Sequence, residues 1–167
     1  MTIPDTDRVE PSRVSDERTM LDQWLDYYRA SLLHKCAGLT VDQVATRPFE
    51  PSAMSLTGLV RHMTNMERVY VHRRADPEVG LLYCTDESPD GDFDDAVGAT
   101  VLADLRLFTE HCSRSREIMA VHQLDETFGT KQPYTLRWIY SYLIKEYARH
   151  LGHADLLRER IDGITGE

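Results

Sequence analysis

Three residues with metal-binding side chains occur at positions that helical periodicity turns toward the protein interior. Glu146 and His150 are four residues apart in a C-terminal segment whose other inward positions are apolar. Residues four apart share one face of a helix, so both side chains can reach a single point. His62 lies on the apolar stripe of an earlier segment. Two ligands from one helix and one from a facing helix can form a metal site in the core of a helical bundle.

These residue types restrict the chemistry of such a site. A buried carboxylate is costly unless a charge or a metal ion pairs with it. Two imidazoles and one carboxylate suit a divalent transition metal such as zinc, nickel or iron, and three protein ligands leave coordination positions open for water or substrate. The spacing of Glu146 and His150 fits two simpler interpretations equally well, in which they hydrogen-bond to each other or face solvent. Spacing alone does not choose among the three.

Four amphipathic segments must position these residues. Apolar side chains recur every three or four residues in each segment, which predicts four long helices. The segments cover residues 15–36, 55–76, 97–119 and 135–163. The sequence therefore predicts an all-α fold, an antiparallel four-helix bundle with a long crossover.

Capping residues support these boundaries. Ser55 and Thr135 directly precede apolar periodic segments, as helix N-caps do. Gly163 stands where a helix C-terminus favours a residue that tolerates positive φ. Thr40 and Gln43 have the spacing of a capping box and predict one short extra helix.

The segment 75–92 separates the second and third of these long helices. It is rich in proline, glycine and acidic residues, which predicts a long loop and not a strand. Asp90, Asp92, Asp94 and Asp95 resemble part of a calcium loop, but the glycine and distal glutamate of an EF-hand are misplaced, so we expect a solvated acidic loop. No segment of the chain alternates apolar and polar residues as a half-buried strand would.

Composition narrows the function classes. The 167 residues include 28 acidic and 19 basic side chains, with a net charge of −9, so the chain lacks the basic surface that a nucleic-acid partner requires. No stretch approaches the roughly 20 apolar residues of a membrane span and no signal peptide is recognisable, so we expect a cytoplasmic protein without a membrane partner. Three cysteines without a C-x-x-C pair fit a reducing compartment. Residues 1–14 indicate an extended N-terminal arm, and residues 15–167 a single domain.

Two segments resemble the signature regions of a known family. PSAMSLTGLVRHMTNMERVY (51–70) and TLRWIYSYLIKEYARHLGHADLLRERIDGITG (135–166) are similar to those of the DinB-like four-helix superfamily. More narrowly, they resemble its actinobacterial branch, which is related to the metal-binding domain of mycothiol-dependent maleylpyruvate isomerase. The similarity extends from DERTMLDQWLDYYR (16–29) to the end of the chain, and the H-x-G-H-A-D-x-x-R-E run at 150–159 is its most specific part.

The resemblance implies a ligand set with one residue from the second long helix and two, four apart, from the last. In this sequence those positions are His62, Glu146 and His150. His153 occupies a position that varies to Gln among relatives, which implies a supporting role beside the ligands. Glu67, five residues after His62, could orient a ligand imidazole or pair with Arg68 or Arg74 in solvent.

The resemblance also implies mycothiol as a cosubstrate. The metal would bind its sulfur as a thiolate, since a free thiol has a pKa of about 8.5 and coordination removes the proton. The thiolate could then attack a small electrophilic substrate, in S-transfer or in cis–trans isomerisation, with the loop at 75–92 contacting the hydroxylated sugars or acting as a lid. Two alternatives stay open: a metal-dependent hydrolase that activates water, and a non-catalytic metal- or ligand-binding bundle. Such a binding bundle could form a homodimer through an exposed helical face.

Overall fold

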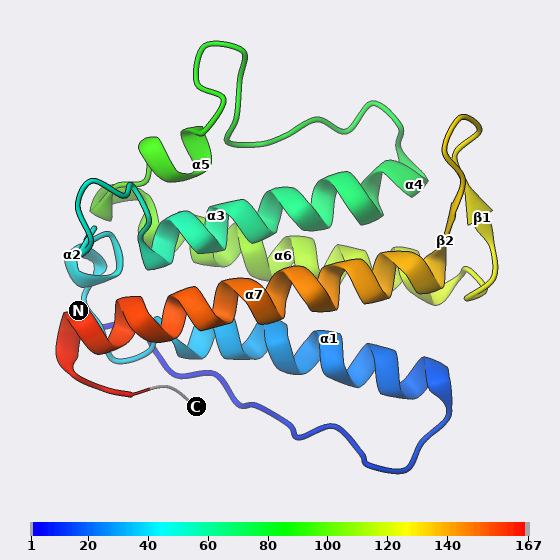
Figure 1. Cartoon of the computed structure of the whole chain (residues 1–167), viewed down its shortest axis with the longest axis horizontal. Helices are drawn as coiled ribbons and strands as arrows, with labels where there is room; N and C mark the ends of the chain where they lie inside the picture. Colours follow the sequence, from blue (N-terminus) through cyan, green and yellow to red (C-terminus); the bar gives the residue numbers. More distant parts are fainter. Residues whose placement is uncertain (1, 166–167) are drawn as a thin grey trace.

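Four long helices form most of the chain in the computed structural model, which describes residues 2–165 (Figure 1). Within this part they are α1 (Glu17–His34), α3 (Leu56–Glu67), α6 (Val101–Ala120) and α7 (Leu136–Asp162). α1 packs against α7, and α3 packs against both α6 and α7. The chain runs along α3 and α6 in one direction and along α1 and α7 in the opposite direction. The prediction of a mostly helical protein is confirmed.

The N-terminal ends of three helices are capped as the sequence predicts. The side chains of Ser55 and Thr135 each accept a backbone N–H from the first turn of α3 and α7. Thr40 and Gln43 form a reciprocal capping box, which begins the short helix α2 (Val41–Val44). Each cap satisfies N–H groups that have no acceptor inside the helix.

The ends of α1 and α7 depend on two further residues. Asp16, not Ser15, is the N-cap of α1, because its carboxylate accepts the N–H of Thr19 at 3.0 Å. The expected start at Ser15 is therefore early by two residues, since α1 begins at Glu17. Gly163 ends α7 with φ of 80°, in the left-handed region that glycine adopts without steric cost.

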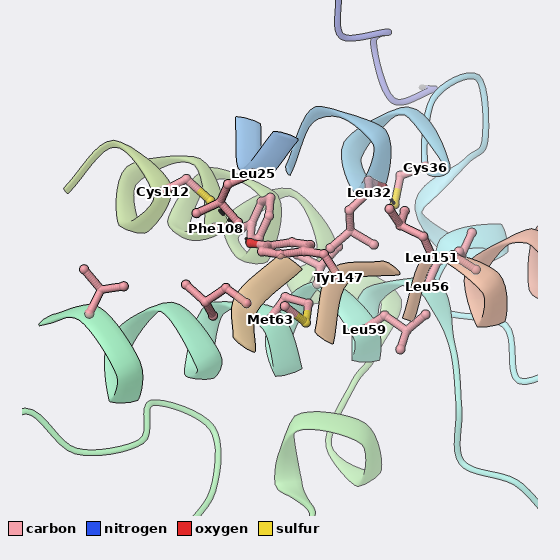
Figure 2. Packing of buried hydrophobic residues seen from close by; sticks show 14 of the residues in the cluster. Leu25, Leu32, Cys36, Leu56, Leu59, Met63, Phe108, Cys112, Tyr147 and Leu151 are labelled. Atoms are coloured by element: carbon pink, nitrogen blue, oxygen red, sulfur yellow. Dashed lines mark hydrogen bonds between the residues drawn. The ribbon is translucent and has the colours of Figure 1, made fainter. Parts of the chain in front are cut away.

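The inward faces of the four helices form one apolar core (Figure 2). Phe108 of α6 and Tyr147 of α7 are fully buried, with ring centroids 6.4 Å apart. Leu25 of α1 and Met63 of α3 belong to the same cluster. Burying such apolar surface stabilises the fold by about 25 cal/mol per Å² and fixes how α3 and α7 face each other. No helix in the described part of the chain is long and apolar enough to cross a membrane.

The connection between α3 and α6 returns along the length of the molecule (Figure 1). Its elements in chain order are the π-helical η1 (Arg68–His72), α4 (Arg73–Ala75), α5 (Gly91–Asp94) and the 3-10 helix η2 (Gly98–Thr100). The expected continuous helix at 55–76 thus changes to a π-helical turn at Arg68. The expected loop at 75–92 is also too long at its end, because α5 begins at Gly91 and packs against α3.

A small hairpin precedes α7. β1 (Thr127–Phe128) and β2 (Tyr134–Thr135) pair antiparallel, with Thr127 opposite Thr135. The expectation that the chain has no strand is therefore wrong. Strands of two residues are too short to produce a visible alternation in the sequence. Gly129, with φ of 80°, supplies the backbone conformation that the turn needs.

The N-terminal segment is extended and runs along the outside of α1 (Figure 1). The N–H of Ile3 donates to the carbonyl of Leu39 at 2.8 Å, and the N–H of Gly38 donates to the carbonyl of Ile3 at 2.8 Å. The side chain of Ile3 is buried in the apolar core. These contacts attach the start of the segment to the loop that follows α1.

Candidate metal centre

His62, Glu146 and His150 meet between α3 and α7. One ligand atom of each lies within 4.8 Å of the others. Nε2 of His150 is 3.5 Å from Oε2 of Glu146, and the ring centroids of His62 and His150 are 4.7 Å apart. Glu146 and His150 share a face of α7 because they are one turn apart, and α3 packs against α7. The three residues that the sequence indicates therefore reach one point.

Glu146 is ionised at neutral pH. Burial raises its pKa, but the hydrogen bond and charge of Lys145, the hydroxyl of Tyr142 and the charge of His150 together lower the pKa below its ordinary range. Nζ of Lys145 is 2.5 Å from the carboxylate. The side chain of Glu146 is 10% exposed. An ionised, largely buried carboxylate is a ready ligand for a cation.

His150 is a neutral imidazole at neutral pH. Burial, together with the neighbouring His62 and His153, lowers its pKa to about 4, against the opposing charge of Glu146. A neutral imidazole keeps a lone pair on one ring nitrogen, which metal coordination requires. Glu146 and His150 are therefore in the protonation states that bind metal.

Asp92 holds the other imidazole of the cluster, that of His62, in place. Its Oδ2 is 2.9 Å from Nδ1 of His62, and its side chain is 8% exposed. The expectation that Asp92 belongs to a solvated acidic loop is wrong, because α5 carries it inward and the ring of Phe93 packs 5.4 Å from that of His62. A carboxylate on one ring nitrogen fixes the tautomer and leaves Nε2 as the free nitrogen. One signal in the sequence could have indicated that this segment turns inward, namely Phe93, an apolar residue within an acidic run.

A sequence model described as mycothiol-S-transferase matches residues 20–163, which include all of the residues of the cluster. The chain belongs to the mycothiol S-transferase family. No curated protein and no solved structure matches the chain. The match confirms the resemblance to the actinobacterial, mycothiol-related branch of the DinB-like proteins that the two signature segments indicate.

Of the two residues that the sequence indicates as supporting residues in this mycothiol S-transferase family member, His153 lies beside the cluster and Glu67 does not. Nδ1 of His153 lies 3.4 Å from Nδ1 of His150, beside the cluster. Glu67 is fully buried, and its carboxylate accepts hydrogen bonds from Arg29 and Tyr147 at 2.8–2.9 Å. Both earlier interpretations of Glu67 are therefore wrong: its oxygens bind Arg29 and Tyr147, and not a ligand imidazole or a surface arginine. The carboxylate that contacts a cluster imidazole comes from the crossover, at Asp92.

The cluster remains within reach of solvent. The side chain of His62 is 21% exposed and that of His150 13% exposed. Three protein ligands leave coordination positions for a further ligand, which distinguishes an open site from a closed structural one. A small molecule could therefore approach the point where the three side chains meet.

Proposed function

We propose that this member of the mycothiol S-transferase family binds a divalent transition metal ion at His62, Glu146 and His150, and joins mycothiol through its sulfur atom to a small electrophilic substrate. The convergence of two imidazoles and a carboxylate within 4.8 Å supports the site, and the family match supports the thiol. We also infer that the long helices form the antiparallel four-helix bundle of DinB-like proteins. Residues 15–167 would then be one metal-binding domain, with residues 1–14 as its arm.

The donor set fits such an ion. Two neutral imidazole nitrogens and one carboxylate suit zinc best, and nickel or iron share the preference. When bound, the ion would lower the pKa of the mycothiol thiol from about 8.5 and hold it as a thiolate. Glu146 supplies one negative charge to the site, while Asp92 keeps His62 in one tautomer through the contact at Nδ1.

The reaction needs one bond to form at sulfur. The thiol proton passes to solvent, the sulfur attacks an electrophilic carbon of the substrate, and the leaving group departs with the electron pair of the bond that breaks. With a cis alkene conjugated to a carbonyl, the same sulfur would add, the carbon–carbon bond would rotate, and elimination would return the thiol with the trans alkene. Both reactions place the electrophile beside the cluster.

The protein's own thiols are unsuited to this role. Burial raises the pKa of both Cys36 and Cys112 to about 12. Burial also raises the pKa of Cys84 above its ordinary value. A thiol is nucleophilic only as thiolate. The reacting sulfur therefore has to come from a small molecule, as the family name suggests.

Metal analysis tests the site. Purified wild-type protein should carry about one transition-metal ion per chain by elemental mass spectrometry. Glu146→Gln and His150→Ala should lose most of it. His122→Ala is the matched control, since His122 pairs with Glu126 at the surface. Full metal retention in both cluster variants would contradict the proposed ligand set.

A thiol comparison tests the chemistry. Metal-loaded protein should gain thermal stability with mycothiol, and much less with glutathione, bacillithiol or coenzyme A. It should also form a thioether from mycothiol and a haloalkyl electrophile, detected by mass spectrometry. A protein that ignores every thiol and hydrolyses an ester or amide would be a metal hydrolase. One that does neither would be a binding protein.

A further inference from the structure

A cavity lies beyond the candidate metal centre, where the helix that continues α3 faces the start of α7. Its volume is about 670 Å³, within the roughly 300–1,000 Å³ of small-molecule sites. Its lining residues are Val69, Tyr70, Arg73, Arg74, residues 132–135 and Trp138. None of these residues takes part in the metal cluster.

An aromatic surface connects this cavity to the cluster. Trp138, Tyr142 and Glu146 follow one another at four-residue intervals on α7, and so share one face. The rings of Trp138 and Tyr142 stack with centroids 4.9 Å apart and planes 20° apart. Tyr70 packs on Tyr142 at 4.3 Å and donates its hydroxyl to that of Tyr142 at 3.0 Å. Glu146 follows Tyr142 by one helical turn on this face of α7.

The separation of the two sites can be worked out from the helix. Glu146 follows Trp138 by eight positions along α7, and a rise of about 1.5 Å per residue gives about 12 Å. A ligand that occupies both sites must therefore have a reactive end and a bulky end about 12 Å apart.

The cavity has polar groups that suit an oxygen-rich ligand. The guanidinium of Arg74 lies 5.0 Å from the ring centroid of Tyr134, and among the described residues its buried Nε has no hydrogen-bond partner. Arg73 donates through Nε to the carbonyl of Val79 at 2.7 Å, which holds its guanidinium at the cavity wall. Arg74 lines the cavity, and the terminal N–H groups of its guanidinium can donate to ligand oxygens. Trp138 is 44% exposed and offers an indole face.

The geometry points to this cavity as the subsite for the two hydroxylated rings of mycothiol, with its cysteine end at the metal cluster. This inference rests on the proposed function. Mycothiol is an N-acetylcysteine amide of a glucosamine–inositol pair, so one end carries sulfur and the other carries two rings. The hydrocarbon faces of these rings can pack on Trp138, while their hydroxyl oxygens accept from Arg74 and Arg73.

The electrophile fits this cavity less well than the thiol does. Its reactive carbon must come within bonding distance of the sulfur, and the sulfur is at the cluster. A small electrophile therefore lies beside His62 and Glu146, about 12 Å from Trp138. Of the two reactants, mycothiol alone is long enough to extend from the cluster to the cavity.

Steady-state kinetics of the metal-loaded protein test the subsite. The measurement compares KM for mycothiol with KM for N-acetylcysteine, which has the same thiol and no rings. Trp138→Leu and Arg74→Gln should each raise the ratio of KM for mycothiol to KM for N-acetylcysteine about tenfold, with metal content as in wild type. Trp24→Leu is the matched control, because Trp24 lies on α1 and is similarly exposed, at 38%. An unchanged ratio in both cavity variants would overturn the inference and leave the proposed function standing.

A binding measurement separates the two proposals. Thiol-free glucosaminyl-inositol should bind wild-type protein in calorimetry, and Trp138→Leu should weaken that binding about tenfold or more. Arg74→Gln provides a second variant in case Trp138→Leu does not fold. This readout needs no catalysis, so a protein that binds the fragment through Trp138 and transfers no thiol would contradict the proposed function alone. Absence of fragment binding to wild type would overturn the subsite.

Discussion

The buried ion pair between Arg29 and Glu67 allows a quantitative test of how the helices are held together. Nε and Nη2 of Arg29 donate to the two carboxylate oxygens of Glu67 at 2.9 and 2.8 Å. Their side chains are 4% and 0% exposed. The hydroxyl of Tyr147 donates to the same carboxylate at 2.8 Å. One buried group therefore joins α1, α3 and α7, the last two of which carry the candidate ligands.

Replacing Glu67 with Gln keeps the shape of the side chain and removes its charge. The guanidinium of Arg29 would then be buried and, among residues 2–165, would keep one charged partner, Asp26, at 2.9 Å and 43% exposed. Removing one member of a buried pair costs roughly 3–5 kcal/mol because the other charge is left uncompensated. Asp26 retains part of the compensation, so we expect a loss of about 3 kcal/mol in the free energy of unfolding. For a chain of this size that lowers Tm by about 6–12 °C.

Urea unfolding followed by circular dichroism measures this loss. The set comprises Glu67→Gln, Arg29→Met and the double variant at neutral pH. The double variant should cost less than the sum of the single ones by more than about 1 kcal/mol, because it removes both charges together. Arg106→Gln is the control, since its pair with Glu110 is exposed (72% and 60%) and should contribute less than about 1 kcal/mol.

The stability that Glu67 contributes should also depend on pH. Burial raises the pKa of Glu67, but the charge and hydrogen bonds of Arg29, with those of Ser115 and Tyr147, lower the pKa below its ordinary value. A carboxyl with a depressed folded pKa stabilises above its unfolded pKa of about 4.3, and the stabilisation is lost as pH falls through the folded value. Glu67→Gln should therefore flatten the acid limb of the stability curve. A loss below about 1 kcal/mol at neutral pH, or full additivity in the cycle, would refute this account.

Two further changes give distinct outcomes. Gly58→Ala would place a Cβ 2.7 Å from the ring of Phe93, so thermal unfolding should show a loss of about 1–3 kcal/mol; Gly152→Ala, with nothing within 4 Å, should instead be neutral or stabilising. Burial and the charges of His72 and Arg68 lower the pKa of His111 to about 4. Stability should thus fall as pH drops from about 6.5 toward 4, where only the unfolded chain takes up the proton, and His111→Gln should reduce the fall in urea midpoints.

The helices and the convergence of the three candidate ligands could be predicted because each depends on short-range order. Helical periodicity and N-caps such as Ser55 and Thr135 act within a few residues, and the structure confirms them. Glu146 and His150 share a face for the same reason. The facing position of His62 follows once two apolar stripes have to pack together. These features can be predicted without knowing which distant parts of the chain come into contact.

The features that sequence reasoning missed are those made by distant contacts. The sequence suggests for Glu67 either a role beside a ligand imidazole or a surface ion pair, whereas its burial depends on Arg29, 38 positions earlier. The π-helical turn at η1 follows directly after the buried Glu67 and has no local signature in this sequence. Two-residue strands at the hairpin leave no alternation to detect. In each case packing between elements decides the local conformation.

The position of Asp92 shows how a functional site can depend on such contacts. A helix as short as α5 (Gly91–Asp94) is not stable alone, because nucleation costs more than one turn returns. Nη2 of Arg47 donates to the carbonyls of Phe93 and Asp94 at 2.9 and 2.7 Å, and the ring of Phe93 fills the space that Gly58 leaves open. These contacts, and not local propensity, bring the Asp92 carboxylate to His62. The orientation of one candidate ligand is thus set by a residue that belongs to neither of the helices that carry the cluster.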